Sequence, residues 1–386
     1  MKLLFVHDHI FYTFEGAVYS TGGLPAKVWQ RYLSVFGSII VIGRNGGELN
    51  SHFEAKNLVK SDCPSVEFEL LDNFSSIIKS PVAIFNWISK INGILRDIDH
   101  LILRVPSHIA LLALILSRRK QFKVVTEVVD CPFDSNWYHG SIMRRLFSPV
   151  AFFLMRYLVS RSDYSIYVTK YFLQRRYPSS GITIYCSNVD IDMTVDYPVA
   201  GLNDDLLLLG IIGTLKGNLK GIQTAIQALP SIIKKHSKVQ LRVLGNGDPS
   251  RFIELAKSLG VEKYVFFDGS LPAGPKVMQW IDSLDIYLHP SFKEGLPRSL
   301  IEAMSRGKPC IASNVAGIPE LIPKEWLIVP GDVLQLSNLI MKISESKKLR
   351  LELGKENIDT SKQYLSKTLN NRRNKFLKSV VSNSQK

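Results

Sequence analysis

The sequence predicts an α/β protein with two doubly wound domains, each built on a parallel sheet that helices cover. Short β-rich runs alternate with amphipathic helical patterns along the whole chain of 386 residues, which is typical of such sheets. The alternation stops at a turn-rich interval, Asp190–Asp205, and then begins again. The chain is also too long for one ordinary hydrophobic core. We therefore expect two domains with a boundary near residue 196.

The β-rich runs define six predicted strands in each half. In the first half they are Leu3–Val6, Ser38–Ile42, Val66–Leu71, Leu101–Val105, Lys123–Val129 and Ser165–Val168. In the second half they are Leu206–Ile212, Val239–Leu244, Val265–Phe267, Ile286–Leu288, Cys310–Ser313 and Leu327–Val329. The predicted domains are residues 1–195 and 196–365, and residues 366–386 form a C-terminal helix or tail that packs back toward the first domain.

The composition excludes several classes of protein. With 46% hydrophobic and 10% aromatic residues, the chain has too many core-forming side chains to be disordered. No signal peptide is evident at the amino end, and the longest apolar runs, Ile109–Leu116 and Pro149–Met155, are shorter than a membrane-spanning helix requires. The four cysteines form no Cys-x-x-Cys pair, which argues against a zinc ribbon or a disulfide framework. We expect a cytoplasmic protein.

The formal net charge of +14 favours an anionic partner. Between residues 140 and 180 the basic side chains are interleaved with aromatic and aliphatic ones, which is typical of a helix that binds a membrane surface. The arginines at its centre are Arg144, Arg145, Arg156 and Arg161. A core helix with a solvated basic face explains the same pattern. The basic residues match no known nucleic-acid motif, so no nucleic-acid partner is expected.

Glycine-rich turns follow the predicted strands of the second half. In two-sheet proteins of this kind the ligand lies in the crevice at the carboxyl ends of the strands. The turn 213–221 supplies Lys216 and Lys220, whose charge suits phosphate, and Gly245 and Asn246 form the next turn. Because glycines let the backbone approach a ligand closely, the pattern predicts a site for a phosphorylated ligand.

Glu294 and Glu302 flank the start of a predicted helix in SFKEGLPRSLIEAM, residues 291–304. Pro297 suits the first turn of that helix, which leaves the amides of Gly295 and Leu296 unpaired and able to bind phosphate. Carboxylates accept hydrogen bonds from hydroxyls. Two carboxylates beside a diphosphate therefore suit two polyols, a ribose and a sugar.

Residues 290–322, PSFKEGLPRSLIEAMSRGKPCIASNVAGIPELI, resemble the E-x7-E signature of the retaining nucleotide-sugar glycosyltransferases of the group 1 type, a large group of bacterial polysaccharide enzymes. Residues 3–33, 213–229 and 241–248 resemble the first strand and loop, the phosphate-binding turn and the nucleotide-contacting turn of the same family. The resemblance covers most of the chain. It implies a GT-B fold, with two Rossmann-like domains facing across a cleft.

The resemblance also implies roles for the residues of the second domain. Glu302 would bind the ribose of the nucleotide, and Glu294 would act at the reaction centre by contacting the transferred sugar. The amides of Gly295 and Leu296 would bind the sugar and the diphosphate. Lys220 matches the phosphate-binding lysine of the family.

One position departs from the family pattern. Thr214 occupies the place of the usual arginine, and we expect Lys216 to substitute for its charge. In the first domain, Gly22 and Gly23 match a loop that closes toward the donor phosphates, although they also suit an ordinary turn. Asp130 lies where the family often has an acceptor-activating side chain, commonly a histidine; a helix cap or a turn before Pro132 is an equal alternative.

The resemblance implies a hexosyltransferase that moves a sugar from a nucleoside-diphosphate sugar to a glycan or lipid-linked acceptor in surface polysaccharide or lipopolysaccharide synthesis. It would work without a metal or cofactor, as a peripheral protein at the cytosolic face of the inner membrane. Two alternatives remain: a nucleotide-sugar epimerase of the same fold, and a non-catalytic protein that binds a membrane surface or nucleic acid.

Three short motifs look like metal ligands: His7-Asp8-His9 and the Asp-x-Asp triplets at 97–99 and 190–192. Neither their spacing nor their position suits a metal site.

Overall fold

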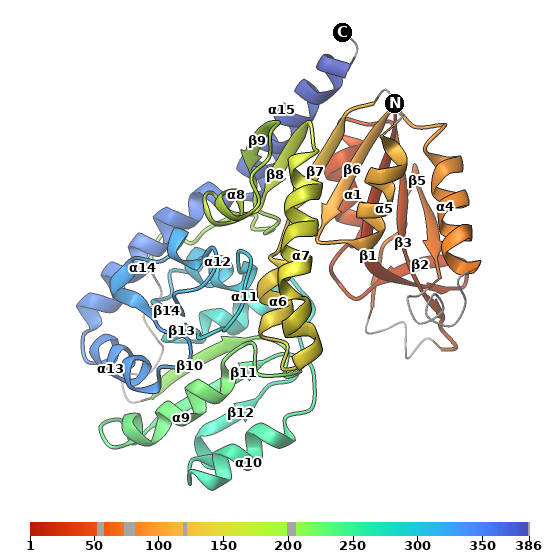
Figure 1. Ribbon diagram of the computed structural model, residues 1–386. Helices are drawn as coiled ribbons and strands as arrows, with labels where there is room; N and C mark the ends of the chain where they lie inside the picture. Colours follow the sequence, from red (N-terminus) through yellow and green to blue (C-terminus); the bar gives the residue numbers. More distant parts are fainter. Residues whose placement is uncertain (52–57, 73–81, 119–121, 199–205, 385–386) are drawn as a thin grey trace.

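The computed structural model describes residues 1–51, 58–72, 82–118, 122–198 and 206–384. Two separate sheets lie in the two halves of the chain, and helices pack around each of them (Figure 1). The first sheet is formed within residues 2–185 and the second within residues 207–328. Residues 199–205, part of the predicted turn-rich interval, lie outside the described residues.

The first sheet has the order β4-β2-β1-β6-β7-β8-β9, and β3 joins it between β1 and β5. Its strands are β1 (Lys2–Phe14), β2 (Ala17–Ser20), β3 (Ser38–Glu48), β4 (Val59–Lys60), β5 (Val66–Leu71), β6 (His100–Val105), β7 (Val124–Val128), β8 (Tyr164–Tyr167) and β9 (Ile182–Tyr185). All six predicted strands are present. The prediction missed β2, β4 and β9, and it ended β1 eight residues too early.

The extension of β1 is a hairpin that the sequence analysis did not recognise. Beyond Val6 the strand continues through polar residues and pairs with β2 in antiparallel orientation. The turn is made by Glu15 and Gly16, which have φ angles of 49° and 74°, as hairpin turns require. The first sheet is therefore mixed, because β4 also pairs with β2 in antiparallel orientation.

The second sheet is parallel throughout and has the order β12-β11-β10-β13-β14-β15. Its strands are β10 (Leu207–Ile212), β11 (Val239–Leu244), β12 (Val265–Phe267), β13 (Ile286–His289), β14 (Cys310–Ser313) and β15 (Leu327–Ile328), which confirms all six predictions. Strand order reverses direction between β10 and β13. Such a switch point is where doubly wound sheets bind ligands, at the carboxyl ends of the strands.

The helices cover both sheets. They are α1 (Ala26–Leu33), α4 (Val82–Ile94), α5 (His108–Ser117), α6 (Pro132–Trp137), α7 (Ile142–Ser160), α8 (Phe172–Arg176), α9 (Ile222–Ile233), α10 (Ser250–Ser258), α11 (Pro275–Asp282), α12 (Arg298–Ser305), α13 (Val333–Ser344), α14 (Lys347–Ser361) and α15 (Ser366–Ser384). Helix α9 shows the usual pattern: Ile222, Ile226 and Leu229, spaced for one face, are buried against the second sheet. None of the helices in the described ranges is long and apolar enough to cross a membrane.

The last helix, α15, returns to the first half of the chain (Figure 1). The rings of Tyr164 and Phe376 pack edge to face with centroids 5.8 Å apart. The buried Arg373 donates from Nη2 to the carbonyl oxygen of Ser187 at 3.0 Å. Helix α15 is thus part of the packing of the first domain, although it follows the second in sequence.

The two domains also touch beside the crevice. The carboxylate of Glu320, in the second domain, accepts hydrogen bonds from the amides of Tyr171 at 3.0 Å and Phe172 at 2.8 Å, at the amino end of α8. A carboxylate suits the positive end of a helix. This contact joins the loop after β14 to the loop after β8.

Candidate active site

The turns after β10 and β13 meet at the switch point of the second sheet. Gly221 has a φ of 68° and precedes α9, and a Cβ there would lie only 1.8 Å from the carbonyl oxygen of Pro290. A Cβ on Gly213 would lie 2.7 Å from Cγ of Lys220. Both positions therefore require glycine, and the space that they leave lets the Lys220 side chain extend toward the turn after β13.

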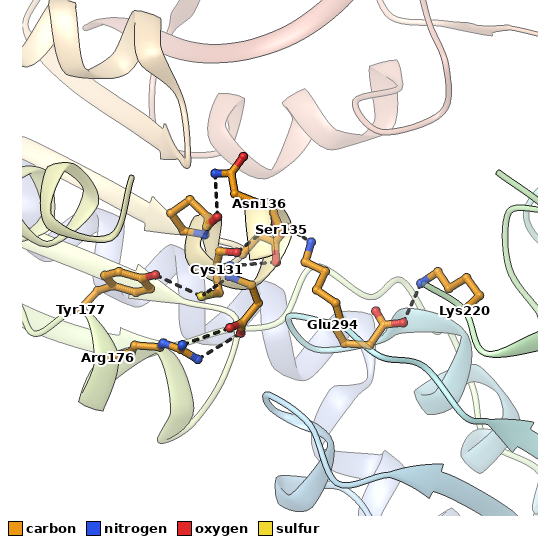
Figure 2. Close-up of polar contacts among 11 residues, drawn as sticks. Cys131, Ser135, Asn136, Arg176, Tyr177, Lys220 and Glu294 are labelled. Carbon is orange, nitrogen blue, oxygen red and sulfur yellow. Dashed lines mark hydrogen bonds and ion pairs between the residues drawn. The ribbon is translucent and has the colours of Figure 1, made fainter. Parts of the chain in front are cut away.

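Lys220 and Glu294 form a direct ion pair in this space (Figure 2). Nζ of Lys220 lies 2.6 Å from Oε1 of Glu294, and Nε2 of the buried His289 lies 2.9 Å from the same oxygen. Burial alone would raise the pKa of Glu294, but the charges of Lys220 and His289 outweigh it and hold that pKa well below its ordinary value. Glu294 is therefore ionised throughout the neutral range.

The ion pair leaves hydrogen-bonding capacity for a ligand. An ammonium group has three N–H donors, and the side chain of Lys220 is 27% exposed. A phosphate oxygen can bind the remaining donors of Lys220 while Glu294 keeps its own contact. The two residues to which the sequence assigns phosphate and sugar contacts thus lie side by side.

The amides of Gly295 and Leu296 lie next to this pair. In the part of the chain that the structure describes, neither amide donates to a protein acceptor. Helix α12 begins at Arg298 and Pro297 is its N-cap, so our placement of Pro297 in the first turn is off by one residue. The cause is the extended backbone of Pro297, with ψ at 117°.

Gly295 also lies where the backbones of the two domains approach each other closely. A Cβ on this residue would lie 2.6 Å from the carbonyl oxygen of Val129, at the end of β7. Its own carbonyl oxygen accepts from the amide of Gly317 at 3.0 Å. A glycine is required here for steric reasons, in addition to any role of its amide.

Glu302 has a different environment from Glu294. Its half-buried side chain lies on the second turn of α12, and within the described ranges its carboxylate has no hydrogen bond or ion pair. Burial raises the pKa of Glu302; Arg298 opposes the rise and the negative charge of Asp190 adds to it. Asp190 is itself held by Lys27 of α1, at 2.7 Å.

Asp130 binds the second domain. Its Oδ2 forms an ion pair with Nζ of Lys293, and its Oδ1 accepts from the amide of Cys131 at 2.8 Å. Burial alone would lower the pKa of Lys293, but Asp130 raises it above its ordinary value. The N-cap of α6 is Cys131, so Asp130 is not the cap that we considered, and its role toward an acceptor stays a prediction.

The turns that contain Lys216 and Asn246 hold each other. The amide of Leu215 donates to the carbonyl oxygen of Asn246 at 2.8 Å, and a Cβ on Gly245 would lie 1.8 Å from the carbonyl oxygen of Gly213. Within the described residues, the exposed side chain of Lys216 has no partner. The structure thus brings the two turns together, and Lys220, in the same turn as Lys216, joins them to Glu294.

Arg251, on α10, was missed by the sequence analysis. Its Nη2 donates to the carbonyl oxygens of Leu215, at 3.0 Å, and Gly217, and thereby fixes the turn after β10. No motif marks this residue, because its partners are backbone atoms far away in sequence.

Gly22 and Gly23 lie in a loop of the first domain that Ser20 organises. Oγ of Ser20 accepts from the amides of Gly22 and Leu24, each at 3.2 Å, and contacts Nε2 of His9 at 2.9 Å. Gly22 has a φ of 96°, which favours glycine. Among the described residues, no hydrogen bond joins this loop to the second domain.

The His7-Asp8-His9 triplet has structural partners. Nδ1 of His7 contacts the carbonyl oxygen of Arg104 at 3.0 Å, and Asp8 accepts from the amides of His108 and Ile109 at the start of α5. Burial lowers the pKa of His7 to about 3. Within the described ranges, no three His, Cys, Asp or Glu side chains gather in a way that suits a metal ion.

A pocket of about 300 Å³ opens between the domains beside Glu294. Lys293 and Glu294 line it from the second domain, and Phe133 and Trp137 of α6 line it from the first. Arg176 forms an ion pair with Asp134 at 3.0 Å on the same wall (Figure 2). An aromatic wall with a few charged groups is typical of small-molecule sites.

The closest contacts of Glu294 were only partly predictable. His289 ends β13 and therefore faces the crevice, a signal that the sequence contains. The neighbouring residue, Lys293, pairs with Asp130 of the other domain. A single sequence contains no signal for this pair between the domains.

Solved structures identify the architecture as the GT-B fold. Sucrose-phosphate synthase from Thermosynechococcus elongatus superposes with a TM-score of 0.75 and 18% identity, covering 99% of both chains. HepE from Anabaena, in complex with UDP, gives a TM-score of 0.68 and 18% identity over 98% of this chain and all of the other. Both show a likeness of fold.

The sequence comparisons identify the family. Residues 194–360 match the family model "Glycosyl transferases group 1". Protein CapJ from Staphylococcus aureus is 31% identical over 372 residues, which are 92% of this chain and 90% of that protein. The amylovoran biosynthesis glycosyltransferase AmsK from Erwinia amylovora is 31% identical over 136 residues, 33% of each chain. The chain belongs to the group 1 glycosyltransferases and has the GT-B fold.

Proposed function

We propose that this glycosyltransferase moves a sugar from a nucleoside-diphosphate sugar to a hydroxyl of a glycan or lipid-linked acceptor, with retention of configuration and without a metal ion. The observation that carries the proposal is the group formed by Lys220, Glu294 and His289 beside two unpaired amides. A cation and free amides suit a diphosphate, and a fixed carboxylate suits the hydroxyls of a sugar.

The donor would extend along the carboxyl edge of the second sheet. Its diphosphate would contact Lys220 and the amides of Gly295 and Leu296, and Lys216 would add a second cation. The ribose would bind Glu302, whose carboxylate has free acceptor capacity. The nucleoside would lie near Gly245 and Asn246, and the loop of Gly22 and Gly23 would cover the phosphates.

The chemistry would rely on the leaving group. As the bond between the sugar and the diphosphate breaks, negative charge develops on the diphosphate, and Lys220 and the amides would stabilise it. The departing oxygen would take the proton of the acceptor hydroxyl, and the acceptor oxygen would bond to the anomeric carbon on the face that the diphosphate leaves, which retains the configuration. Glu294 would hold the sugar in place, because positioned reactants require less ordering in the transition state.

The acceptor would enter the pocket between the domains, which Lys293 lines, and Asp130, the partner of Lys293, would contact its reacting hydroxyl. We propose a growing surface polysaccharide or lipopolysaccharide, bound at the cytosolic face of the membrane, where the chain acts as a peripheral protein. The relationship to AmsK, which is named for amylovoran biosynthesis, supports an acceptor of this class.

The donor is found first and the reaction is then tested with a radiolabelled form of it. In a screen of UDP-, GDP- and ADP-sugars, we expect the true donor to raise the melting temperature of the protein, because a ligand that binds only the native state stabilises it. The HepE complex with UDP makes the UDP-sugars the first choice. The active donor should yield free nucleoside diphosphate and a labelled acceptor whose anomeric configuration, read by NMR, matches the donor. A new nucleotide sugar would instead identify an epimerase, and salt-dependent RNA binding without donor binding would refute both.

A further inference from the structure

Helix α7 carries apolar side chains on two opposite faces. One face, which includes Ala151, Met155 and Leu158, is buried against the first domain. The other face is exposed to solvent. Its four most exposed side chains are Ile142 (78%), Met143 (76%), Leu146 (71%) and Phe153 (65%).

The exposed apolar residues form one continuous stripe. Met143, Leu146, Val150 and Phe153 are spaced three or four residues apart, and Phe147 and Leu154 are also exposed. Residues with this spacing share one face of a helix. The alternative of a core helix with a solvated basic face is therefore incomplete, because much of the solvated face is apolar. Contiguous exposed apolar surface marks an interaction site.

The charge of the helix indicates which partner covers this stripe. Residues 141–162 contain four arginines and no acidic residue, and Arg144, Arg156 and Arg161 are exposed. Arg145 packs on the ring of Trp137, 4.1 Å from its centroid. Two copies of the chain packed through this face would bring like charges together, whereas an anionic lipid surface supplies both apolar chains and negative charge.

A groove beside Phe153 suits a lipid headgroup. It has a volume of about 370 Å³ and is lined by Phe153, Arg156, Tyr157, Ser160 and residues 178–180. Arg156 supplies a guanidinium group, and Ser179 and Ser180 supply hydroxyls, whereas the hydroxyl of Ser160 donates to the carbonyl oxygen of Tyr157 at 2.8 Å. An arginine with hydroxyls is a suitable set of donors for a phosphate group, and the groove lies where the apolar stripe would meet the headgroups.

We propose that α7 lays its exposed apolar stripe into an anionic membrane surface and binds a lipid phosphate in the groove at Arg156. The proposal goes beyond arginine-mediated attraction, because it assigns most of the affinity to the apolar side chains. It also orients the protein. Trp137 lines the pocket beside Glu294 and α7 begins five residues later, so the docked helix would place the mouth of that pocket near the membrane. This last step rests on the proposed function.

Sedimentation of the full chain with vesicles tests the surface without any donor. We expect binding to vesicles of phosphatidylcholine with phosphatidylglycerol. Leu146→Ser and Phe153→Ser should each weaken it about tenfold, the scale expected for removing one large inserted side chain. Phe85→Ser and Leu334→Ser are matched controls, because these side chains are 70% and 69% exposed on α4 and α13, and they should bind like wild type.

A substitution at Arg156 tests the groove separately from the apolar stripe. Arg156→Gln should weaken binding to the anionic vesicles severalfold and leave binding to phosphatidylcholine alone unchanged. Inorganic phosphate at high concentration should not displace the protein, because the apolar stripe would still be inserted. Displacement by phosphate would overturn the insertion and leave only an anion site.

Three outcomes would overturn the proposal. They are absence of vesicle binding by the wild type, equal binding by all variants, and a dimer in light scattering that Leu146→Ser converts to a monomer, which would assign the stripe to a second copy. Melting temperatures check that each variant is folded. Donor binding without membranes, measured by thermal shift, should be unchanged in all of them; its absence in the wild type would refute the proposed function alone, since vesicle binding is measured separately.

Discussion

Glu294 and Glu302 lie eight residues apart, before and within the same helix, and their surroundings are opposite. Glu294 is buried and paired with Lys220 and His289, so its pKa is held low. Glu302 is half-buried without a bonded partner in the described part of the chain, and its pKa is raised. Two carboxylates that look alike in the sequence are thus prepared for different tasks.

The difference shows that the free protein stabilises the charge of Glu294 but not the charge of Glu302. The partners of Glu294 are in place before any ligand binds, so its position is fixed and its contribution to binding is mainly geometric. Glu302 keeps its acceptor sites free, and burial makes its charge costly until a donor hydroxyl arrives. We therefore expect the first carboxylate to matter for stability and catalysis, and the second to matter for donor affinity.

The largest effect should come from removing Lys220. Lys220→Ala leaves the buried charge of Glu294 with one partner fewer, and it removes a cation from the leaving diphosphate. We expect kcat/KM to fall about 100- to 1,000-fold and the free energy of unfolding to fall by about 2 kcal/mol. Steady-state kinetics and denaturant unfolding measure both. Lys257→Ala, an exposed lysine on α10, is the control, and equal behaviour of the two variants would contradict the assignment.

Amide substitutions of the two glutamates separate their tasks. Glu302→Gln should weaken donor binding roughly 10- to 100-fold, the loss expected for hydrogen bonds to a charged acceptor, and leave the melting temperature of the free protein unchanged or higher. Glu294→Gln should lower the free energy of unfolding by about 1–3 kcal/mol, because Lys220 loses its partner. Calorimetric titration and thermal unfolding give the two readings. The comparison fails if Glu302→Gln is the less stable variant.

As the pH falls, Glu302 should be protonated before Glu294. The pKa of Glu302 is raised above the ordinary 4.5, so as the pH falls it takes up a proton first and donor binding weakens. The cost of its buried charge disappears at the same time. Glu294 has a lowered pKa, so its stabilisation is present above about pH 4.5 and is lost only as the pH falls further. Donor titrations at several pH values should show an acid loss that Glu302→Gln abolishes; the same loss in that variant would assign it to another group.

The smallest effect should come from the ion pair between the domains. Lys293 and Asp130 have side chains that are 18% and 27% exposed, and partly exposed pairs contribute little. Asp130→Asn should lower the free energy of unfolding by about 1 kcal/mol or less. Its effect on KM for the acceptor should exceed its effect on KM for the donor. Equal effects on both would remove Asp130 from the acceptor side.

The sequence predicted the second domain better than the first. Apart from β11, its strands are short and mainly apolar, as strands of a buried parallel sheet are. Four of them, β10, β11, β12 and β15, are followed within three residues by a glycine. In the first domain, β1 continues through His7, Asp8 and His9, whose polarity resembles the end of a strand. Strand β4 has two residues and β9 has exposed ones, so neither has a distinct pattern.

The site was predictable where one turn supplies the residues and unpredictable where distant turns meet. Gly295, Leu296 and Glu294 lie within one short motif. The pairing of Lys220 with Glu294 joins positions 74 apart, and Arg251 acts on backbone atoms, so residue identity alone gives no signal for either contact. The order of the strands brings these turns together, and it is not encoded locally.

The close approach at Gly295 limits how narrow the gap between the two lobes can become. A methyl group at this position would meet the carbonyl oxygen of Val129 and act as a wedge, holding the lobes apart without altering any charge. Gly295→Ala would therefore be a mechanical substitution, one that separates the effect of spacing from the effect of chemistry. The missing side-chain carbon of Gly295 is thus one of the features that let the two domains approach this closely.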